Sequence, residues 1–376
     1  MFKLRGDLST SQSILLGILG LLIFIVTWWV IAEVLSVQRP VVDGYTTRIP
    51  SEAEAAEQGI NRDSLLQADS IRFENASEFV KVYPILPTPV QVVKAFPALI
   101  KEKKLISNTI ISVWRNLQGY FWAVLISIPI GFVIGLFPIF KGLFSKQVDA
   151  LRYLPLTALV GMFITWFGIG ESMKISFLAF GIIVYLLPTV IQRIREVSDV
   201  YLRTVFTLGA TDWQTIRSVY LPSVMAKLVD DIRVLTAISW TYIIIAELLN
   251  KDGGIGALIY DAGRRGQIPD VFAVLIVIVL IGFLQDRVFV YLDKRLFPHK
   301  YFKSRLAGIQ EVGYGIYIML GAVVLYLILS ALLGVFGVSV GSTLAWGVGL
   351  IVVASVAMIA LGEFKVRSAV ASADKN

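Results

Sequence analysis

Leu208-Gly209-Ala210 and Val219-Tyr220-Leu221-Pro222 belong to one polar stretch that lies between two apolar segments of membrane length. A long apolar chain by itself indicates only a membrane protein. A structured loop with a glycine hinge at a fixed distance from Leu-Pro indicates in addition that another molecule docks there. Both the fold and the function of this chain are therefore inferred from this loop.

The loop contains two short helical patterns. The first covers residues 199–208, and Gly209 suits the left-handed conformation that ends a helix. A second helix is expected to start at the capping-box pattern formed by Thr211 and Gln214. We expect Pro222 to end it, because the residue before a proline is disfavoured in helical angles. Such a compact pair of helices needs a surface on which to bury its apolar side chains.

The composition is that of a helical membrane protein. Of the 376 residues, 56% are apolar and 16% are charged, whereas about a quarter of an ordinary soluble domain is charged. Several apolar segments approach or exceed the ~20 residues that cross the hydrocarbon core as a helix. They lie near 14–35, 110–138, 154–170, 174–192, 229–250, 271–292, 314–336 and 343–362. We predict an all-α polytopic membrane protein with eight spans, of which the third is short and interrupted.

The net charge of +7 is not taken as a sign of nucleic-acid binding, because the basic residues cluster in alternate loops between the apolar segments. Enrichment of Lys and Arg in cytoplasmic loops is the usual result of membrane insertion. The pattern predicts a multi-pass protein of the cell inner (plasma) membrane with both termini in the cytoplasm.

Residues of the common catalytic and metal sites are missing from the sequence. There is no cysteine, and the single histidine, His299, lies in a basic run after an apolar segment. The Gly-x-x-x-x-Gly-Lys-Ser/Thr loop that binds nucleotide phosphates does not occur. We therefore expect no enzymatic activity, no cofactor and no metal site.

A further helix start lies ahead of the second apolar segment. Thr88 is a suitable cap and Pro89 suits the first helical position. Apolar residues then follow at helical spacing, from Val90 and Val93 to Phe96 and Ile100. An amphipathic helix at the outer surface and a simple helical linker both fit this pattern.

The loop resembles the signature of the inner-membrane permease subunits of binding-protein-dependent ABC importers. That signature reads Glu-Ala-Ala, three residues, Gly, nine residues, Ile, any residue, Leu-Pro. In this chain Gly209 and Val219-Tyr220-Leu221-Pro222 have the same spacing, whereas Arg203-Thr204-Val205 stands in place of Glu-Ala-Ala.

The resemblance covers roughly residues 84–300 and is closest to the nitrate/sulfonate/taurine branch. Supporting stretches are Leu86-Pro87-Thr88-Pro89, residues 114–120, residues 165–170, Ala246-Glu247-Leu248 and Gly253-Gly254-Ile255-Gly256. We divide the chain into four parts: an N-terminal membrane helix, an external polar insertion, a permease core with a coupling loop, and a C-terminal two-helix membrane hairpin with a cytoplasmic tail. In the same order, these are residues 1–35, 36–83, 84–300 with the loop at 199–222, and 301–376. The first helix and the five apolar segments of the core make up the six-helix ABC importer permease core that the resemblance implies, and the insertion and the hairpin are additions to it.

The resemblance also implies the partners. The loop would fit a groove in cytoplasmic ATP-binding subunits, which hydrolyse the ATP. The other implied partners are an external solute-binding protein and the lipid bilayer. The chain would also pair with a second copy of itself or with a similar permease. The coupling residues would be Arg203, Thr204, Val205, Leu208, Gly209, Ala210, Trp213, Leu221 and Pro222.

Charged residues at membrane depth are candidates for the substrate pathway. Arg115 and Glu247 lie near the outer ends of their apolar segments and are assigned to it here, although a structural pairing also fits. The solute would be a small one, and an anion such as nitrate, a sulfonate or taurine fits the resemblance. A secondary transporter or a structural membrane protein is the alternative, but the former would be expected to show internal repeats and the latter would not explain the loop.

Overall fold

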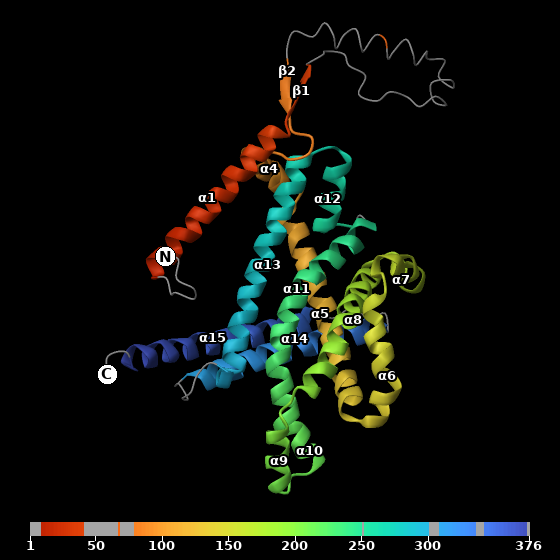
Figure 1. The fold of residues 1–376 in the computed structure, drawn as a ribbon, viewed down its shortest axis with the longest axis vertical. Coiled ribbons are helices and arrows are strands. Elements are labelled where there is room, and N and C mark those ends of the chain that lie inside the picture. Colours follow the sequence, from red (N-terminus) through yellow and green to blue (C-terminus); the bar gives the residue numbers. More distant parts are fainter. Residues whose placement is uncertain are drawn as a thin grey trace. The chain divides into compact units, whose positions relative to one another are not determined.

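The computed structural model describes residues 9–40, 67, 79–249, 252–300, 308–335 and 342–373 (Figure 1). Most of the polar insertion at 36–83 and the end of the C-terminal tail lie outside these ranges. The chain divides into two compact units, residues 1–105 with 258–276, and residues 106–257 with 277–376.

The first unit contains a long helix, a strand pair and a capped helix. The elements are α1 (Thr10–Val34), β1 (Val37–Pro40), β2 (Phe79–Val82) and α4 (Pro89–Lys101). The strands are antiparallel, with Val37 opposite Val82. The expected start of α4 is confirmed, because the side chains of Thr88 and Gln91 cap each other's backbone N–H groups. The indole N–H of Trp28 on α1 donates to the Pro87 carbonyl, at 2.9 Å, and so connects α1 to this start.

The second unit holds most of the helices. In order they are α5 (Leu105–Leu136), α6 (Pro138–Ala150), α7 (Val160–Phe167), α8 (Glu171–Arg195), α9 (Asp199–Thr207), α10 (Asp212–Thr215), α11 (Leu221–Leu249), α14 (Ile309–Val335) and α15 (Ser342–Ala373). Helices α12 (Ile255–Arg264) and α13 (Ile268–Leu296) each contribute residues to both units.

Within the described ranges, six helices are long and apolar enough to cross a membrane, namely α1, α5, α8, α13, α14 and α15. A seventh span results if α6 and α7, which are bent by 94° at a short break, are counted as one. The predicted third segment, 154–170, corresponds to the second half of this pair, and α6 precedes the predicted segment. Residues 229–249 of the predicted segment 229–250 are helical as part of α11, but this helix is not among these spans. The all-α membrane fold is thus confirmed, with six or seven spans identified where eight were predicted.

Helices α5 and α8 approach closely because glycines of α5 face branched side chains of α8. A Cβ atom added at Gly131 would lie 2.5 Å from Val190, and one at Gly135 would lie 2.6 Å from Ile194. The Gly131-x-x-x-Gly135 pattern therefore permits the close helix packing that small residues allow in membranes. Helices α14 and α15 of the C-terminal hairpin also approach closely at a glycine, since a Cβ at Gly362 on α15 would lie 2.6 Å from Val312 on α14.

Replacing Gly131 by alanine is expected to destabilise the protein by about 1–3 kcal/mol, the usual cost of overpacking a close contact. The matched control is Gly142→Ala on α6, where an added Cβ meets nothing within 4 Å. The midpoint of thermal unfolding in detergent should fall for the first variant and hold for the second. Equal midpoints would contradict the packing role of Gly131.

Candidate functional site

The polar loop forms two short capped helices, as predicted. Helix α9 ends at Gly209, whose φ of +74° is the left-handed conformation expected there. The Thr211 hydroxyl accepts a hydrogen bond from the Gln214 backbone N–H, and the Gln214 side chain accepts one from the Thr211 N–H, at 3.3 and 2.9 Å. The helix–Gly–helix geometry is therefore fixed by local contacts.

Pro222 does not end the second helix, so this prediction was wrong. Helix α10 continues through a π-helical segment, Ile216–Tyr220, directly into α11. In that segment the Leu221 N–H bonds to the Ile216 carbonyl, five residues back. A return from π to α geometry already leaves one carbonyl without a helical donor, so a proline at that place removes no bond the helix would otherwise make. The loop is consequently joined to α11 by continuous helix.

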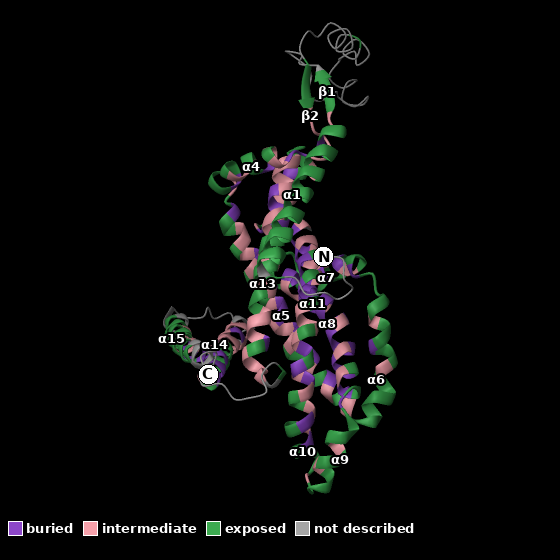
Figure 2. Cartoon of the chain, turned by 60° about the vertical axis from the view of Figure 1, so that its left-hand side comes forward, coloured by how far each residue is buried: buried purple, intermediate pink, exposed green. Residues whose placement is uncertain are grey.

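Most residues of the two short helices are exposed (Figure 2), and large apolar residues are among them. Leu208 is 79% exposed and Trp213 is 70% exposed. Val200, Tyr201 and Phe206 on α9 are also exposed. Of the remaining residues assigned to coupling, Arg203, Thr204, Gly209, Leu221 and Pro222 are exposed, and Val205 and Ala210 are half-buried.

Ion pairs hold the loop end of α11 against its neighbours. Arg193 at the end of α8 binds both carboxylate oxygens of Asp231, each at 2.7 Å, and also Glu196. The hydrogen bond from Arg193 holds the pKa of Glu196 below its ordinary value. Lys300, after α13, binds Asp230 and Asp293 and the Ala226 carbonyl.

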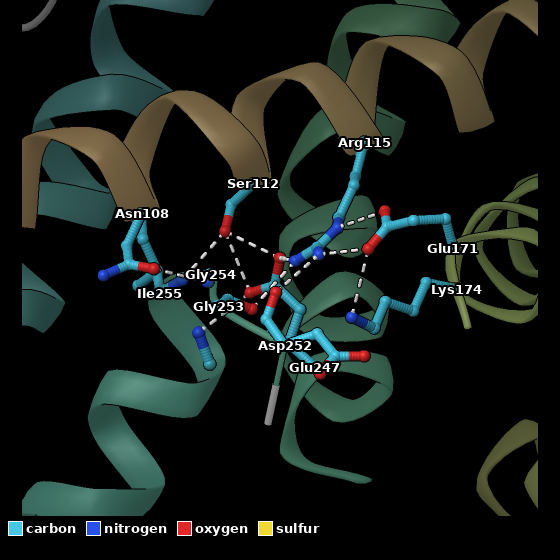
Figure 3. A network of polar contacts seen from close by, with 11 residues as sticks. Asn108, Ser112, Arg115, Glu171, Lys174, Glu247, Asp252, Gly253, Gly254 and Ile255 are labelled. Carbon is cyan, nitrogen blue, oxygen red and sulfur yellow. Dashed lines mark hydrogen bonds and ion pairs between the residues drawn. The ribbon is translucent and has the colours of Figure 1, made fainter. Parts of the chain in front are cut away.

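A second polar cluster lies deep among α5, α8 and α11 (Figure 3). Arg115 is 2% exposed and Glu247 is fully buried, and they form an ion pair at 2.8 Å. The Arg115 guanidinium also binds both carboxylate oxygens of Glu171 at the start of α8, and Lys174 pairs with Glu171 at 3.3 Å. Arg115, Lys174 and Glu247 are buried, whereas the Glu171 side chain is 55% exposed at the edge of the cluster. The two cations and two anions neutralise one another, as buried charges require.

The glycine-rich turn before α12 closes this cluster. The Gly256 N–H donates to Glu247 at 2.9 Å, and the carbonyl of Gly253 accepts from Arg115 at 2.9 Å. At Gly254, where φ is +107°, a Cβ would lie 2.3 Å from the Glu247 carboxyl carbon. The turn can therefore reach the carboxylate only because glycine stands there.

The sequence prediction found two of the ions in this cluster and missed the others. Glu171 directly follows the Gly168-Ile169-Gly170 turn, but no short-range signal connects it with Arg115. Lys174 is the first residue of the predicted segment 174–192, and in the structure it is a fully buried residue of α8. The structural pairing of Arg115 and Glu247, left open by the sequence, is present, and their part in the pathway stays a prediction.

Residues 127–298 match the family described as binding-protein-dependent transport system inner membrane component. The chain is 30% identical over 213 residues to a Bacillus subtilis protein described as an aliphatic sulfonates transport permease. This match covers 56% of this chain and 77% of that protein. It is 29% identical over 218 residues to the taurine transport system permease protein of Escherichia coli, covering 57% and 79% of the two chains. A Methanocaldococcus jannaschii protein described as an ABC transporter permease is 29% identical over 207 residues, 55% of this chain and 78% of that one.

The chain belongs to this family. The nitrate/sulfonate/taurine branch, suggested by the resemblance across residues 84–300, is confirmed, since taurine and sulfonate permeases are among the relatives. The expectation of a membrane transport subunit, and not an enzyme, is confirmed with it. The family match ends at residue 298, so α14 and α15 lie beyond it.

Removing one member of the buried ion pair is expected to destabilise the protein strongly. Arg115→Gln or Glu247→Gln leaves the partner charge buried without its counterion, at a cost of about 3–5 kcal/mol. The double variant should cost less than the sum of the two single variants, because no unpaired charge remains between these positions. Denaturant unfolding in detergent measures all three, with the exposed Arg265→Gln as control. Simple additivity would show that the two residues do not interact.

Proposed function

We propose that this chain is the permease subunit of an ATP-driven ABC importer for a small anion of the sulfonate or taurine type. Two copies, or one copy and a similar permease, would enclose the pathway in the cell inner membrane. Separate ATP-binding subunits would supply the energy from the cytoplasm. A solute-binding protein would deliver the solute from outside.

One observation carries this proposal. Leu208 and Trp213 are large apolar residues on a rigidly capped helix pair, and both are held out in solvent. Exposed apolar side chains that cluster on a structured surface are a feature of protein–protein interfaces. Residues 199–222, with Gly209 at their centre, therefore form the proposed coupling element for the ATP-binding subunit.

The mechanical connection supports the same function. Since α10 runs through the π-helical segment into α11, a displacement of the docked loop is transmitted along one helix. The ion pairs of Asp231 and Asp230 spread this displacement to α8 and to the segment after α13. A flexible loop could not transmit such a movement.

The choice of solute follows the relatives. Taurine and aliphatic sulfonates share a sulfonate group, a small oxyanion. A pathway for such a solute needs cationic hydrogen-bond donors, for which arginine is best suited.

The coupling role is tested with Leu208→Asp and Gly209→Ala. The first places a charge on the docking surface, and the second strains a backbone at φ +74° by about 1–2 kcal/mol. We expect Leu208→Asp to weaken binding of the ATP-binding subunit that co-purifies with the unmodified chain by at least about tenfold, since burying a leucine contributes about 1.5–3 kcal/mol. Taurine uptake by the assembled transporter should fall in both variants.

The control is Ser218→Ala, an exposed polar position in the π-helical segment. It should leave co-purification and uptake unchanged, and all three variants should remain monodisperse in detergent. Unaltered binding of the ATP-binding subunit to Leu208→Asp and Gly209→Ala would refute the coupling assignment.

A further inference from the structure

Helix α6 and the turn after it carry charged side chains in the part of the chain that forms the bent span. Lys141, Ser145, Asp149 and Arg152 follow one another at intervals of four, four and three residues. Residues at these intervals share one face of a helix. We call this set the polar stripe. Another face of α6 carries the exposed residues Ile139, Leu143 and Lys146.

Contacts with α8 show how deep the polar stripe lies. The guanidinium of Arg195, the last residue of α8, donates to the Ser145 hydroxyl at 2.8 Å. Val148 packs with Leu187 and Ile191, which lie further into α8, so α6 runs back alongside α8 (Figures 1 and 2). At 1.5 Å per residue, Arg152 is roughly 10 Å beyond Ser145 along this direction. It therefore lies at the level of the apolar span of α8 and not at its end.

A charged side chain at membrane depth is stable only in certain surroundings. An ionised side chain facing hydrocarbon is costly, so such residues face a protein interior or a water-filled cavity. Asp149 and Arg152 are 3.7 Å apart, and their side chains remain 60% and 41% exposed within this chain. The helix also breaks directly after them, and broken helices at membrane depth occur where they line a cavity.

Arg115 is less suited to hold an anionic solute. Its Nε, NH1 and NH2 atoms already donate to the carboxylates of Glu171 and Glu247 and to the carbonyls of Asp252 and Gly253. Arg152, by contrast, has a 3.7 Å contact with Asp149 that leaves its guanidinium accessible.

We propose that the polar stripe of α6 lines the aqueous pathway and that Arg152, oriented by Asp149, is the residue that binds the anionic group of the solute. This rests on the permease function proposed above and adds the site that selects an oxyanion such as a sulfonate. Arginine binds such a group through parallel hydrogen bonds. Lys141 extends the positive charge toward the coupling-loop end of the pathway.

The chain has no cysteine, so single cysteines can report the surroundings of each position. We would introduce Asp149→Cys on the polar stripe and, as the control, Leu280→Cys on α13, in membranes that contain the assembled transporter. Leu280 is exposed and lies in the middle of the apolar stretch of that span. Each is treated with two methanethiosulfonate reagents, one bearing a sulfonate and one a trimethylammonium group. Ser145→Cys is a second position on the polar stripe, in case Asp149→Cys does not assemble.

The proposal expects Asp149→Cys to react with both reagents and Leu280→Cys to react with neither. It further expects Arg152→Gln, added to Asp149→Cys, to lower the ratio of sulfonate to trimethylammonium labelling rates by roughly three- to tenfold, because local charge sets the local concentration of ions. Arg152→Lys should restore most of the ratio.

Labelling of Asp149→Cys as slow as that of Leu280→Cys would overturn the aqueous pathway. An unchanged ratio in Arg152→Gln would overturn the anion-binding role of Arg152. Labelling does not depend on ATP hydrolysis, whereas the coupling proposal is tested by binding of the ATP-binding subunit. Failure of one proposal is thus distinguishable from failure of the other.

Discussion

The helix bundle depends on keeping charge neutral where water is excluded. Arg115 and Glu247 come from α5 and α11, and each would be strongly destabilising without its counterion. An apolar pair of similar volume is often as stable as a buried ion pair. The ions also fix the register of the helices, because only one relative position of α5, α11 and the glycine-rich turn satisfies every donor and acceptor around Glu247.

The polar cluster around Arg115 and Glu247 lies at one end of α11, and the coupling loop lies at the other end. Pro222 is in its first turn and Glu247 is in its last turn, about 38 Å apart at 1.5 Å per residue. The π-helical segment at Ile216–Tyr220 is what allows the loop to be one piece with this helix in spite of the proline. A movement imposed on the loop would therefore act on the Arg115 network at the far end without passing through any flexible connection.

The features predicted correctly from the sequence are those set by adjacent residues. Thr88, Gly209 and Thr211 act as caps because a cap needs only the next few residues of the chain. The proline rule failed at Pro222 because it assumes continuous α geometry. The closing partner Glu171 was missed because it is 56 residues from Arg115, and only tertiary packing brings the two together.

The C-terminal hairpin is connected to the core at the end that carries the coupling loop. Glu363 of α15 accepts hydrogen bonds from Tyr291 and Arg295 of α13, at 2.8 and 2.7 Å. Lys300, between α13 and the hairpin, holds Asp293 and also the Ala226 carbonyl in the early turns of α11. Hydrogen bonds and an ion pair of Glu363 thus hold the hairpin to α13 at this end. Within the hairpin, α14 and α15 pack closely on each other at glycines. The hairpin would therefore move together with α11 and α13 when the coupling loop is displaced.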